Sequence, residues 1–426
     1  MQKLQNNSIV NLSEYKPKKN THIMKKQIYL IVILMTLSFE AGFAKATRPF
    51  PQNVNYKFGV KPTTITDKDA LNTYNKWKEL FLVKCNAGYR VTGESQDETR
   101  VEAIGFGTIL SAYFADKATF DGLYAFYKSK RTATANNMMA WNVSCDGIND
   151  PGSASDGDID VAFALIVAHN QWGGNYLKEA KTIINIIKKS VVTKCGNVLA
   201  LAPGYSKESK EGPMWGGCDL TDIQYYTPAF FRIFAKVSND NDWNKLADDT
   251  YTILNAAAHP ETGLVPDWQS VSGTPGGNSN RVAYFRYDAC RAPWRLALDY
   301  LWNGNTKSKE WSTKISGWAN KVGPANIKDG YNLDGTDHND GNHNSAFVGG
   351  LAVSAMCNNQ AIADAFGAEM LSPKLGDLHW FAMSTRALYL TTLTGNFWKP
   401  NVALKQASKT VKHQPIRSKS LSSTKK

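Results

Sequence analysis

The stretch Ala154-Ser155-Asp156-Gly157-Asp158-Ile159-Asp160-Val161-Ala162 places three carboxylates within five residues, directly before an apolar helical pattern. Apolar residues continue at roughly helical spacing as far as Trp172, which predicts a helix with a buried face. Ser155 or Asp156 is expected to be its N-cap, because a side-chain oxygen there can accept the free amides of the first turn. Acidic side chains thus gather where a helix begins, either as caps of a core helix or as part of a functional site.

A calcium loop is the first alternative for this stretch, because an EF-hand loop also begins with Asp-x-Asp-x-Asp. That loop needs Gly at its sixth position and a bidentate Glu at its twelfth. Here those positions hold Val161 and Val167, so the calcium loop is excluded. The run from Asp337 to His343 could suggest another metal, but nothing in the sequence fixes it on a rigid element. We interpret that run as a solvated loop and expect no metal or cofactor.

The composition limits the possible functions. The chain has 426 residues, 42% of them hydrophobic, and a formal net charge of +12. Basic chains often bind nucleic acids, but here many of the charges lie at the two ends, and no Lys/Arg stripe alternates with aromatic residues. We therefore expect no nucleic-acid partner. The six cysteines are too widely spaced for a zinc pattern, and the sequence leaves open whether they pair or stay free.

The N-terminal part resembles a secretory leader. Met24-Lys25-Lys26 begins a positive segment, the apolar run from Ile28 to Leu37 is too short to span a bilayer comfortably, and Gly42-Phe43-Ala44 offers a cleavage site. A signal anchor is the alternative. We expect a mature chain that begins near Lys45, with residues 1–23 an extension upstream of the true start. The divisions are then 1–44, a catalytic domain over 45–402, and a basic tail over 403–426.

Helix follows helix through most of the chain. Thr66 and Asp69 form a capping-box pattern before the first helix, and a second helix runs from Val101 to about Ala115. Further amphipathic segments are expected near 118–130, 158–171, 175–190, 222–237, 240–258, 288–303, 307–321, 343–357, 359–371 and 377–395. About twelve helices without a fixed-length repeat favour a closed ring of helical hairpins over an open solenoid.

Glu102 lies at the edge of the second helix, in apolar, Gly-bearing surroundings. Burial there would raise the pKa of its carboxyl group towards that of a general acid. The alternative is a surface Glu in a first helical turn, which the helix dipole favours.

Several blocks in order resemble glycoside hydrolase family 8. The stretch 154–162 with Trp172 resembles the family signature, with Val161 in place of the usual Ile or Met. The block 102–107 resembles its Glu-Gly-x-Gly-Tyr-Gly acid block, with Ala103 and Phe106 as substitutions. Further blocks agree at 225–229, 263–268, 287–295 and 395–400.

The resemblance implies an all-α (α/α)6 barrel that hydrolyses β-1,4 glycosidic bonds with inversion. Inversion requires two carboxyl groups about 6.5–9.5 Å apart, with a water between base and sugar. Glu102 would be the general acid and Asp288 the general base, and Tyr225 would hold the water. Asp156 would hydrogen-bond the sugar at the cleavage point, and Arg291 would keep Asp288 ionised.

The resemblance also bears on the substrate. Chitosanase-type members carry Asn where this chain has Asp288, and a basic protein would repel polycationic chitosan. Trp presents a broad apolar face to sugars, and the candidate platforms are Trp141, Trp172, Trp215 and Trp268. We predict a secreted or periplasmic, monomeric endo-β-1,4-glucanase. Xylanase, mixed-linkage glucanase or chitosanase activity, a non-catalytic glycan-binding barrel and a part in cellulose synthesis remain alternatives.

Overall fold

A computed structural model of the chain describes residues 45–209, 212–338, 341–375 and 379–402. The chain divides into two units, Met1–Lys45 and Ala46–Lys426, and every helix and strand of the described residues belongs to the second. The expected signal segment 24–44 and basic tail 403–426 lie outside the described residues.

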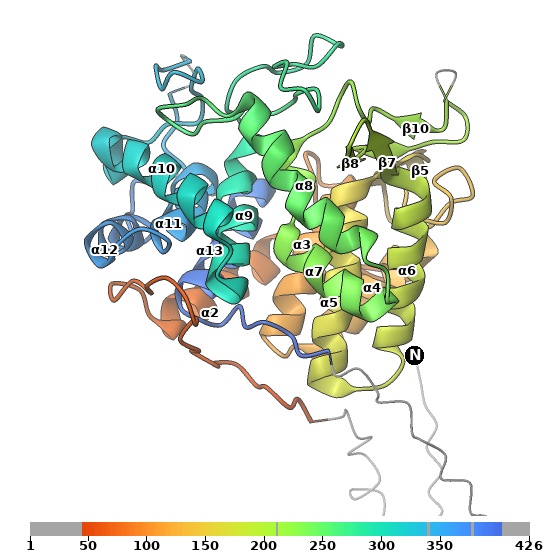
Figure 1. Ribbon diagram of the computed structural model, residues 1–426. Helices are drawn as coiled ribbons and strands as arrows, with labels where there is room; N and C mark the ends of the chain where they lie inside the picture. The colour runs from red at the N-terminus through yellow and green to blue at the C-terminus, as the bar shows by residue number, and fades with distance from the viewer. Residues whose placement is uncertain (1–44, 210–211, 339–340, 376–378, 403–426) are drawn as a thin grey trace, which may run out of the picture. The chain divides into compact units, whose positions relative to one another are not determined.

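Twelve α-helices occur in the described part of the chain, and they alternate between an inner and an outer layer (Figure 1). The inner helices are α3 (Val101–Tyr113), α5 (Ser155–Trp172), α7 (Pro228–Ser238), α9 (Ala292–Asn303), α11 (Ser345–Ala355) and α13 (Trp380–Leu393). The outer helices are α2 (Asp67–Phe81), α4 (Lys117–Ser129), α6 (Tyr176–Val191), α8 (Asp242–Ala257), α10 (Thr306–Val322) and α12 (Gln360–Glu369).

Burial distinguishes the two layers. Nearly all residues of α3, α5, α11 and α13 are buried, as expected for helices surrounded by protein on every side. The outer helices α2 and α6 bury only one stripe each. The last inner helix, α13, packs against α3, so the inner layer closes on itself. The chain thus forms the (α/α)6 barrel that the sequence predicts.

Short strands occur only in the connections between helices of the described residues. They form two hairpins and two three-stranded sheets. The hairpins are β1 (Leu82–Cys85) with β2 (Gly88–Val91) and β7 (Val192–Cys195) with β8 (Val198–Leu201). The sheets join β3 (Thr99–Arg100), β4 (Asn142–Val143) and β5 (Ile148–Asp150), and β6 (Ser153–Ala154), β9 (Gly204–Tyr205) and β10 (Met214–Trp215). Three 3₁₀ turns complete the fold: η1 (Ile223–Tyr225), η2 (Ala289–Arg291) and η3 (Pro324–Asn326).

The observed starts of the helices agree with the sequence predictions in one case and differ in two. The capping box at Thr66 and Asp69 is present. The predicted N-cap of α5 is wrong: Ala154 is the N-cap, and the Ser155 hydroxyl donates instead to the carbonyls of Ala202 and Pro203. The helix predicted from 222 is divided into η1 and α7, because Pro228 begins a new helix.

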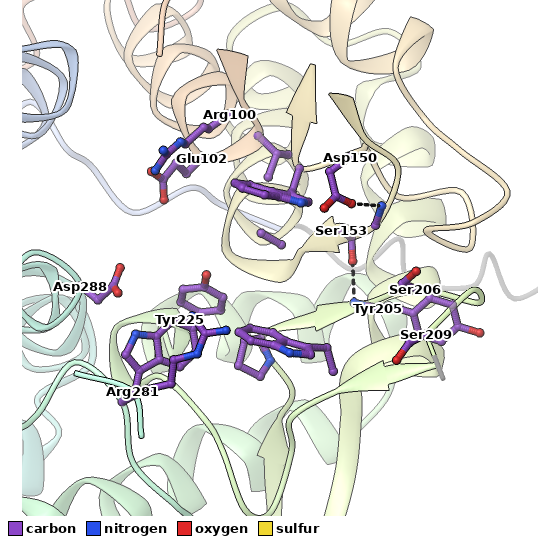
Figure 2. Close-up of a pocket in the computed structure, with 17 residues that line it drawn as sticks. Arg100, Glu102, Asp150, Ser153, Tyr205, Ser206, Ser209, Tyr225, Arg281 and Asp288 are labelled. Atoms are coloured by element: carbon purple, nitrogen blue, oxygen red, sulfur yellow. Dashed lines mark hydrogen bonds between the residues drawn. The ribbon is translucent and has the colours of Figure 1, made fainter. Parts of the chain in front are cut away.

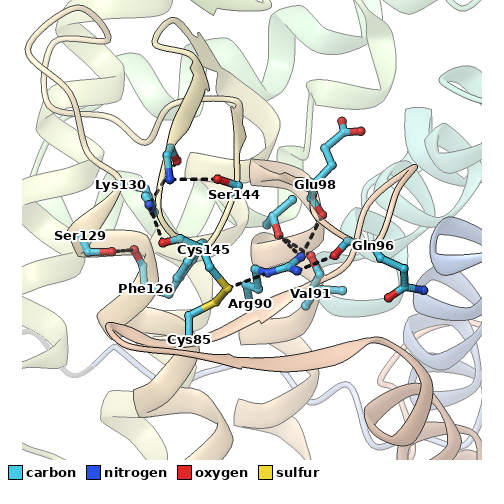
Figure 3. The surroundings of a disulfide bond; sticks show 12 residues. Cys85, Arg90, Val91, Gln96, Glu98, Phe126, Ser129, Lys130, Ser144 and Cys145 are labelled. Carbon is cyan, nitrogen blue, oxygen red and sulfur yellow. Dashed lines mark hydrogen bonds between the residues drawn. A yellow bond between two sulfur atoms is a disulfide. The ribbon is translucent and has the colours of Figure 1, made fainter.

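The cysteines divide into bonded and free. Cys85 pairs with Cys145 and Cys195 with Cys218, whereas Cys290 and Cys357 are buried free thiols. Arg90 lies beside the first disulfide, where its Nε donates to Cys145 Sγ at 3.1 Å and its Nη1 donates to the Glu98 carbonyl at 3.1 Å (Figure 3). Arg90 therefore connects the disulfide to the loop that precedes α3. None of the helices described here is both long and apolar enough to span a bilayer.

Candidate active site

Residues at or just before the N-terminal ends of the inner helices line one cleft. They comprise Glu102 of α3, Ala154 before α5, Tyr225 before α7, Asp288 and Arg291 before α9, Asn344 before α11 and His379 before α13. In an alternating barrel the inner helices run in one direction, so their first turns meet at one end. The fold itself therefore gathers side chains that are far apart in the sequence.

The cleft consists of two cavities of about 560 and 660 Å³. Three residues line both of them: Arg100, Glu102 and Asp288. Figure 2 shows the carboxylates of Glu102 and Asp288 facing the same open space, with the ring of Tyr225 next to Asp288. Two acids thus stand where the halves of an extended groove meet, which is the place for a reaction on the middle of a chain-like substrate.

Two glycines bring Glu102 and Asp156 together. A Cβ on Gly157 would lie 2.6 Å from the carbonyl carbon of Val101, and a Cβ on Gly105 would lie 2.8 Å from the Cβ of Asp160. Real Cβ atoms do not approach other atoms so closely, so α3 and α5 cross at a distance that only glycine allows. The Gly of the stretch 154–162 therefore serves to place the first turn of α5 against the first turn of α3.

Arg291 connects the acids of the site. Its Nη1 donates to Glu102 Oε2 at 3.0 Å and to Asp156 Oδ2 at 3.1 Å, and its Nη2 donates to Asp288 Oδ1 at 2.5 Å. The bound oxygens of Glu102 and Asp288 lie within about 8 Å of each other, since a planar guanidinium fixes the spacing of its nitrogens. The arginine side chain is only 2% exposed, so these contacts replace its hydration.

Burial dominates the protonation of Glu102. It raises the pKa of Glu102 to about 7, and the charges of Asp156 and Asp288 act in the same direction against the opposing charge of Arg291. The first helical turn favours an ionised Glu, but burial outweighs that effect. The surface alternative is not what the structure shows, because the Glu102 side chain is 16% exposed.

Asp288 differs from expectation in its electrostatics. Burial raises the pKa of Asp288 above its usual range, although Arg291 and Trp268 oppose the rise. Arg291 lies beside Asp288 and favours its ionised form, as the sequence predicts, but the same guanidinium also faces Glu102 and Asp156. Asp288 is also the N-cap residue of η2 rather than part of a long α-helix. Its side chain remains 31% exposed, which leaves it accessible from the cleft.

Asp267 was not predicted from the sequence as a site residue, but it binds the backbone on both sides of Asp288. Asp267 is 3% exposed, and its Oδ1 accepts the backbone amides of Arg286 at 2.8 Å and Ala289 at 2.7 Å. These amides flank Asp288, so Asp267 fixes the backbone that carries it. The only signal in the sequence was the position of Asp267 in the block 263–268.

Tyr225 and Asp156 lie at the floor of the site. Tyr225 is 7% exposed, and burial followed by the surrounding carboxylates raises its pKa well above the usual value, so it remains a neutral hydroxyl. Asp156 is fully buried, and its Oδ1 accepts the amide of Gly157 at 2.9 Å. Asp156 lines neither cavity, and its Oδ2 accepts from Arg291 Nη1 at 3.1 Å, so the structure connects it to the cleft through Arg291.

The four predicted tryptophan platforms separate into two groups. Trp141, Trp215 and Trp268 line the first cavity, and the rings of Trp215 and Trp268 meet edge to face at 5.4 Å. Trp172 is not brought to the cleft. It ends α5, about 24 Å along the helix from Asp156, and packs against Phe120 and Tyr176. Helical spacing correctly predicts that Trp172 is buried, but the residue lies at the C-terminal end of α5, whereas the cleft lies at the N-terminal end.

The loop considered for a metal has other contacts. His338 stacks on Tyr284, and His343 contacts the carbonyl of Ile327 and the carboxylate of Glu369. Residues 339–340 of this loop lie outside the described residues. In the ranges that the structure describes, no group of three His, Cys, Asp or Glu side chains could hold a metal ion.

Comparison with known proteins points to one family. The sequence model described as "Glycosyl hydrolases family 8" matches residues 50–384. "Endoglucanase 2" of Ruminiclostridium josui is 35% identical over 373 residues, which are 83% of this chain and 77% of that protein. "Beta-glucanase" of Niallia circulans is 32% identical, over 78% of this chain and 86% of that protein. The solved structure of a Beta-1,3-1,4-glucanase from Paenibacillus sp. X4 is similar with a TM-score of 0.74 at 28% identity, over 83% of this chain and all of that one.

Proposed function

Because the chain belongs to glycosyl hydrolase family 8, we propose that it is an inverting endoglucanase that cleaves internal β-1,4-glucosidic bonds of cellulose-like glucans. The observation that carries the proposal is the pair of carboxyl groups, Glu102 and Asp288, at the junction of two cavities. A groove that continues on both sides of the acids suits a substrate that extends past the cleaved bond in both directions.

The proposed reaction is a single displacement. Glu102, with a pKa of about 7, carries the proton that passes to the leaving glycosidic oxygen. Asp288 removes a proton from a water molecule, and that water attacks the anomeric carbon from the opposite face. The Tyr225 hydroxyl orients the water, and Asp156 holds the sugar at the cleavage point through hydrogen bonds. The bound oxygens of Glu102 and Asp288 lie within about 8 Å of each other, a limit that includes the spacings of both inverting and retaining enzymes, so inversion rests on the family and is tested by the anomer released.

The substrate class is tested by product analysis. Purified enzyme is incubated with defined cello- and xylo-oligosaccharides and with mixed-linkage glucan and chitosan, and NMR follows the anomer released. We expect α-anomeric products from cello-oligosaccharides cut at internal bonds. Cleavage of chitosan or xylo-oligosaccharides alone would refute the assignment to glucans, and β-anomeric products would refute inversion. The names "Endoglucanase 2" and "Beta-glucanase" of two relatives support a glucan substrate. Mixed-linkage glucan is the second candidate because of the similar Paenibacillus structure.

The alternative function is a barrel that binds glycans without cleaving them. A variant of the proposed acid distinguishes it from an enzyme. Glu102→Gln retains the shape of the side chain but cannot supply the proton, so kcat should fall by about 10²–10⁴ while oligosaccharide binding persists. A wild-type protein that binds oligosaccharides without turnover would support the non-catalytic barrel instead. A variant with unchanged kcat would place the acid elsewhere.

Export of the protein and its division into segments are also part of the proposed function. We propose a leader over residues 24–44, a catalytic domain over 45–402, and a monomer without cofactor that acts outside the cytoplasm. Two disulfides support an oxidising compartment. The mass of the exported protein tests the leader, since a mass that retains residues 24–44 would contradict it.

A further inference from the structure

Arg281 is a cation of the cleft that has no acidic partner among the described residues. It lines the first cavity and is exposed, and among the described residues no carboxylate forms an ion pair with it. Arg100, which lines the same cavity, pairs with Glu94 and Glu98. Figure 2 places Arg281 on the wall that carries Tyr225, facing the wall that carries Asp150.

Two tryptophans hold the guanidinium of Arg281 in position. Its Cζ lies 5.0 Å from the ring centroid of Trp215 and 5.5 Å from that of Trp268, which are cation–π distances. The loop that carries it is bound to the backbone of Trp268 on both sides: Gly276 donates its amide to the Trp268 carbonyl, and Trp268 donates to the carbonyl of Val282. The charge is therefore held over the two tryptophans, in the same cavity that Glu102 and Asp288 line.

A guanidinium in this position is suited to bind an anionic group of a substrate. Its planar fork of N–H groups fits a carboxylate in a bidentate arrangement, and aromatic faces stabilise the cation without neutralising it. A neutral glucan would fill this part of the cleft and leave the charge without a counter-ion. We propose that Arg281 is a specificity residue that binds a carboxylate substituent on the β-glucan chain, so that the enzyme prefers acidic over neutral glucans. This inference rests on the proposed endoglucanase function.

The experiment compares two soluble β-1,4-glucans, carboxymethylcellulose and hydroxyethylcellulose, by their kcat/KM values. Arg281→Gln should lower kcat/KM on carboxymethylcellulose about three- to fivefold, as for one partly exposed ion pair, with less than about a twofold change on hydroxyethylcellulose. Arg281→Lys should retain part of the preference, because it keeps the charge but not the fork. Lys189→Gln removes an equal charge from an exposed site on α6, outside both cavities, and should leave the ratio unchanged.

Salt provides the second readout. The preference of the wild type for carboxymethylcellulose should decline between about 20 and 500 mM NaCl, because salt screens an exposed ion pair. The Arg281→Gln ratio should not change with salt. Equal losses on both substrates would overturn the inference in favour of hydrogen bonds to neutral sugar, and no loss on either would leave only a packing role. Failure of the wild type on both substrates would instead refute the proposed function.

Discussion

Glu102 and Asp288 are connected through a single guanidinium, although 185 positions separate them in the sequence: Arg291 contacts the first through Nη1 at 3.0 Å and the second through Nη2 at 2.5 Å. One positive charge serves three carboxylates, including Asp156. This imbalance favours a bound proton in the cluster, which a general acid requires at neutral pH.

Arg291 should be needed for both stability and turnover. Arg291→Met leaves buried carboxylates without compensation and should lower the free energy of unfolding by about 3–5 kcal/mol. Arg291→Lys restores a charge but not the fork, so it should recover stability better than kcat. Denaturant melts and initial rates measure the two effects. Arg295→Lys is the matched control, because Arg295 forms a buried pair with Asp160 away from the cavities. Wild-type kcat in Arg291→Lys would contradict the argument.

The pH profile should carry the pKa of Glu102. The acid works only when protonated, so kcat/KM should decline above a pH of about 7, at which half of Glu102 is ionised. The acidic limb, which reports Asp288, should lie above the range of an ordinary Asp because burial raises its pKa. Initial rates on cello-oligosaccharides from pH 4 to 9 measure both limbs. A plateau that continues to pH 9 would contradict the assignment of Glu102.

Stability should depend on the same proton. The pKa of Glu102 is raised on folding, so the folded state retains a proton that the unfolded state releases at the usual value of 4.5. Its contribution to the free energy of unfolding is complete below about pH 4.5 and is lost as the pH rises through about 7. Urea melts of the wild type and Glu102→Gln should therefore differ in slope across this range, with the variant less sensitive to pH. Parallel curves would contradict the raised pKa.

Gly157 should tolerate no side chain. Gly157→Ala places a Cβ against the backbone of α3 and should cost about 1–3 kcal/mol of stability, and it should lower kcat because Asp156 moves relative to Glu102. Gly317→Ala in α10 is the control, because a Cβ there meets no atom within 4 Å and alanine favours the helix. Thermal melts and initial rates distinguish the two variants, and equal effects of both would refute the close helix crossing.

Asp267 should position the base without touching substrate. Asp267→Ala leaves one buried and one partly buried amide without an acceptor, which should cost about 1–3 kcal/mol for the buried one and release the Asp288 backbone. We expect kcat to fall by about tenfold or more with little change in KM. Asp267→Asn retains an acceptor oxygen and should restore most of kcat. If Asp267→Asn loses as much kcat as Asp267→Ala, then Asp267 does more than accept hydrogen bonds from the backbone.

The periodicity of apolar residues predicted most helices correctly, because an inner or outer helix needs the same spacing of buried residues wherever it lies. The start of α5 could not be derived in this way: Ser155 is a good N-cap by residue type, but a tertiary hydrogen bond to Ala202 takes its hydroxyl. The prediction of Trp172 as a sugar platform was wrong for a related reason. The spacing of apolar residues shows which face of a helix is buried but not which end of the helix lies at the cleft. The partners of Arg281 and Asp267 arise from loop contacts that no local pattern encodes.

Among the described residues, the two cavities meet at Arg100, Glu102 and Asp288, so a glucan that spans both would leave one fragment on each side of the acids after hydrolysis. Cuts at such internal positions would lower the viscosity of a polymer solution quickly while releasing few reducing ends.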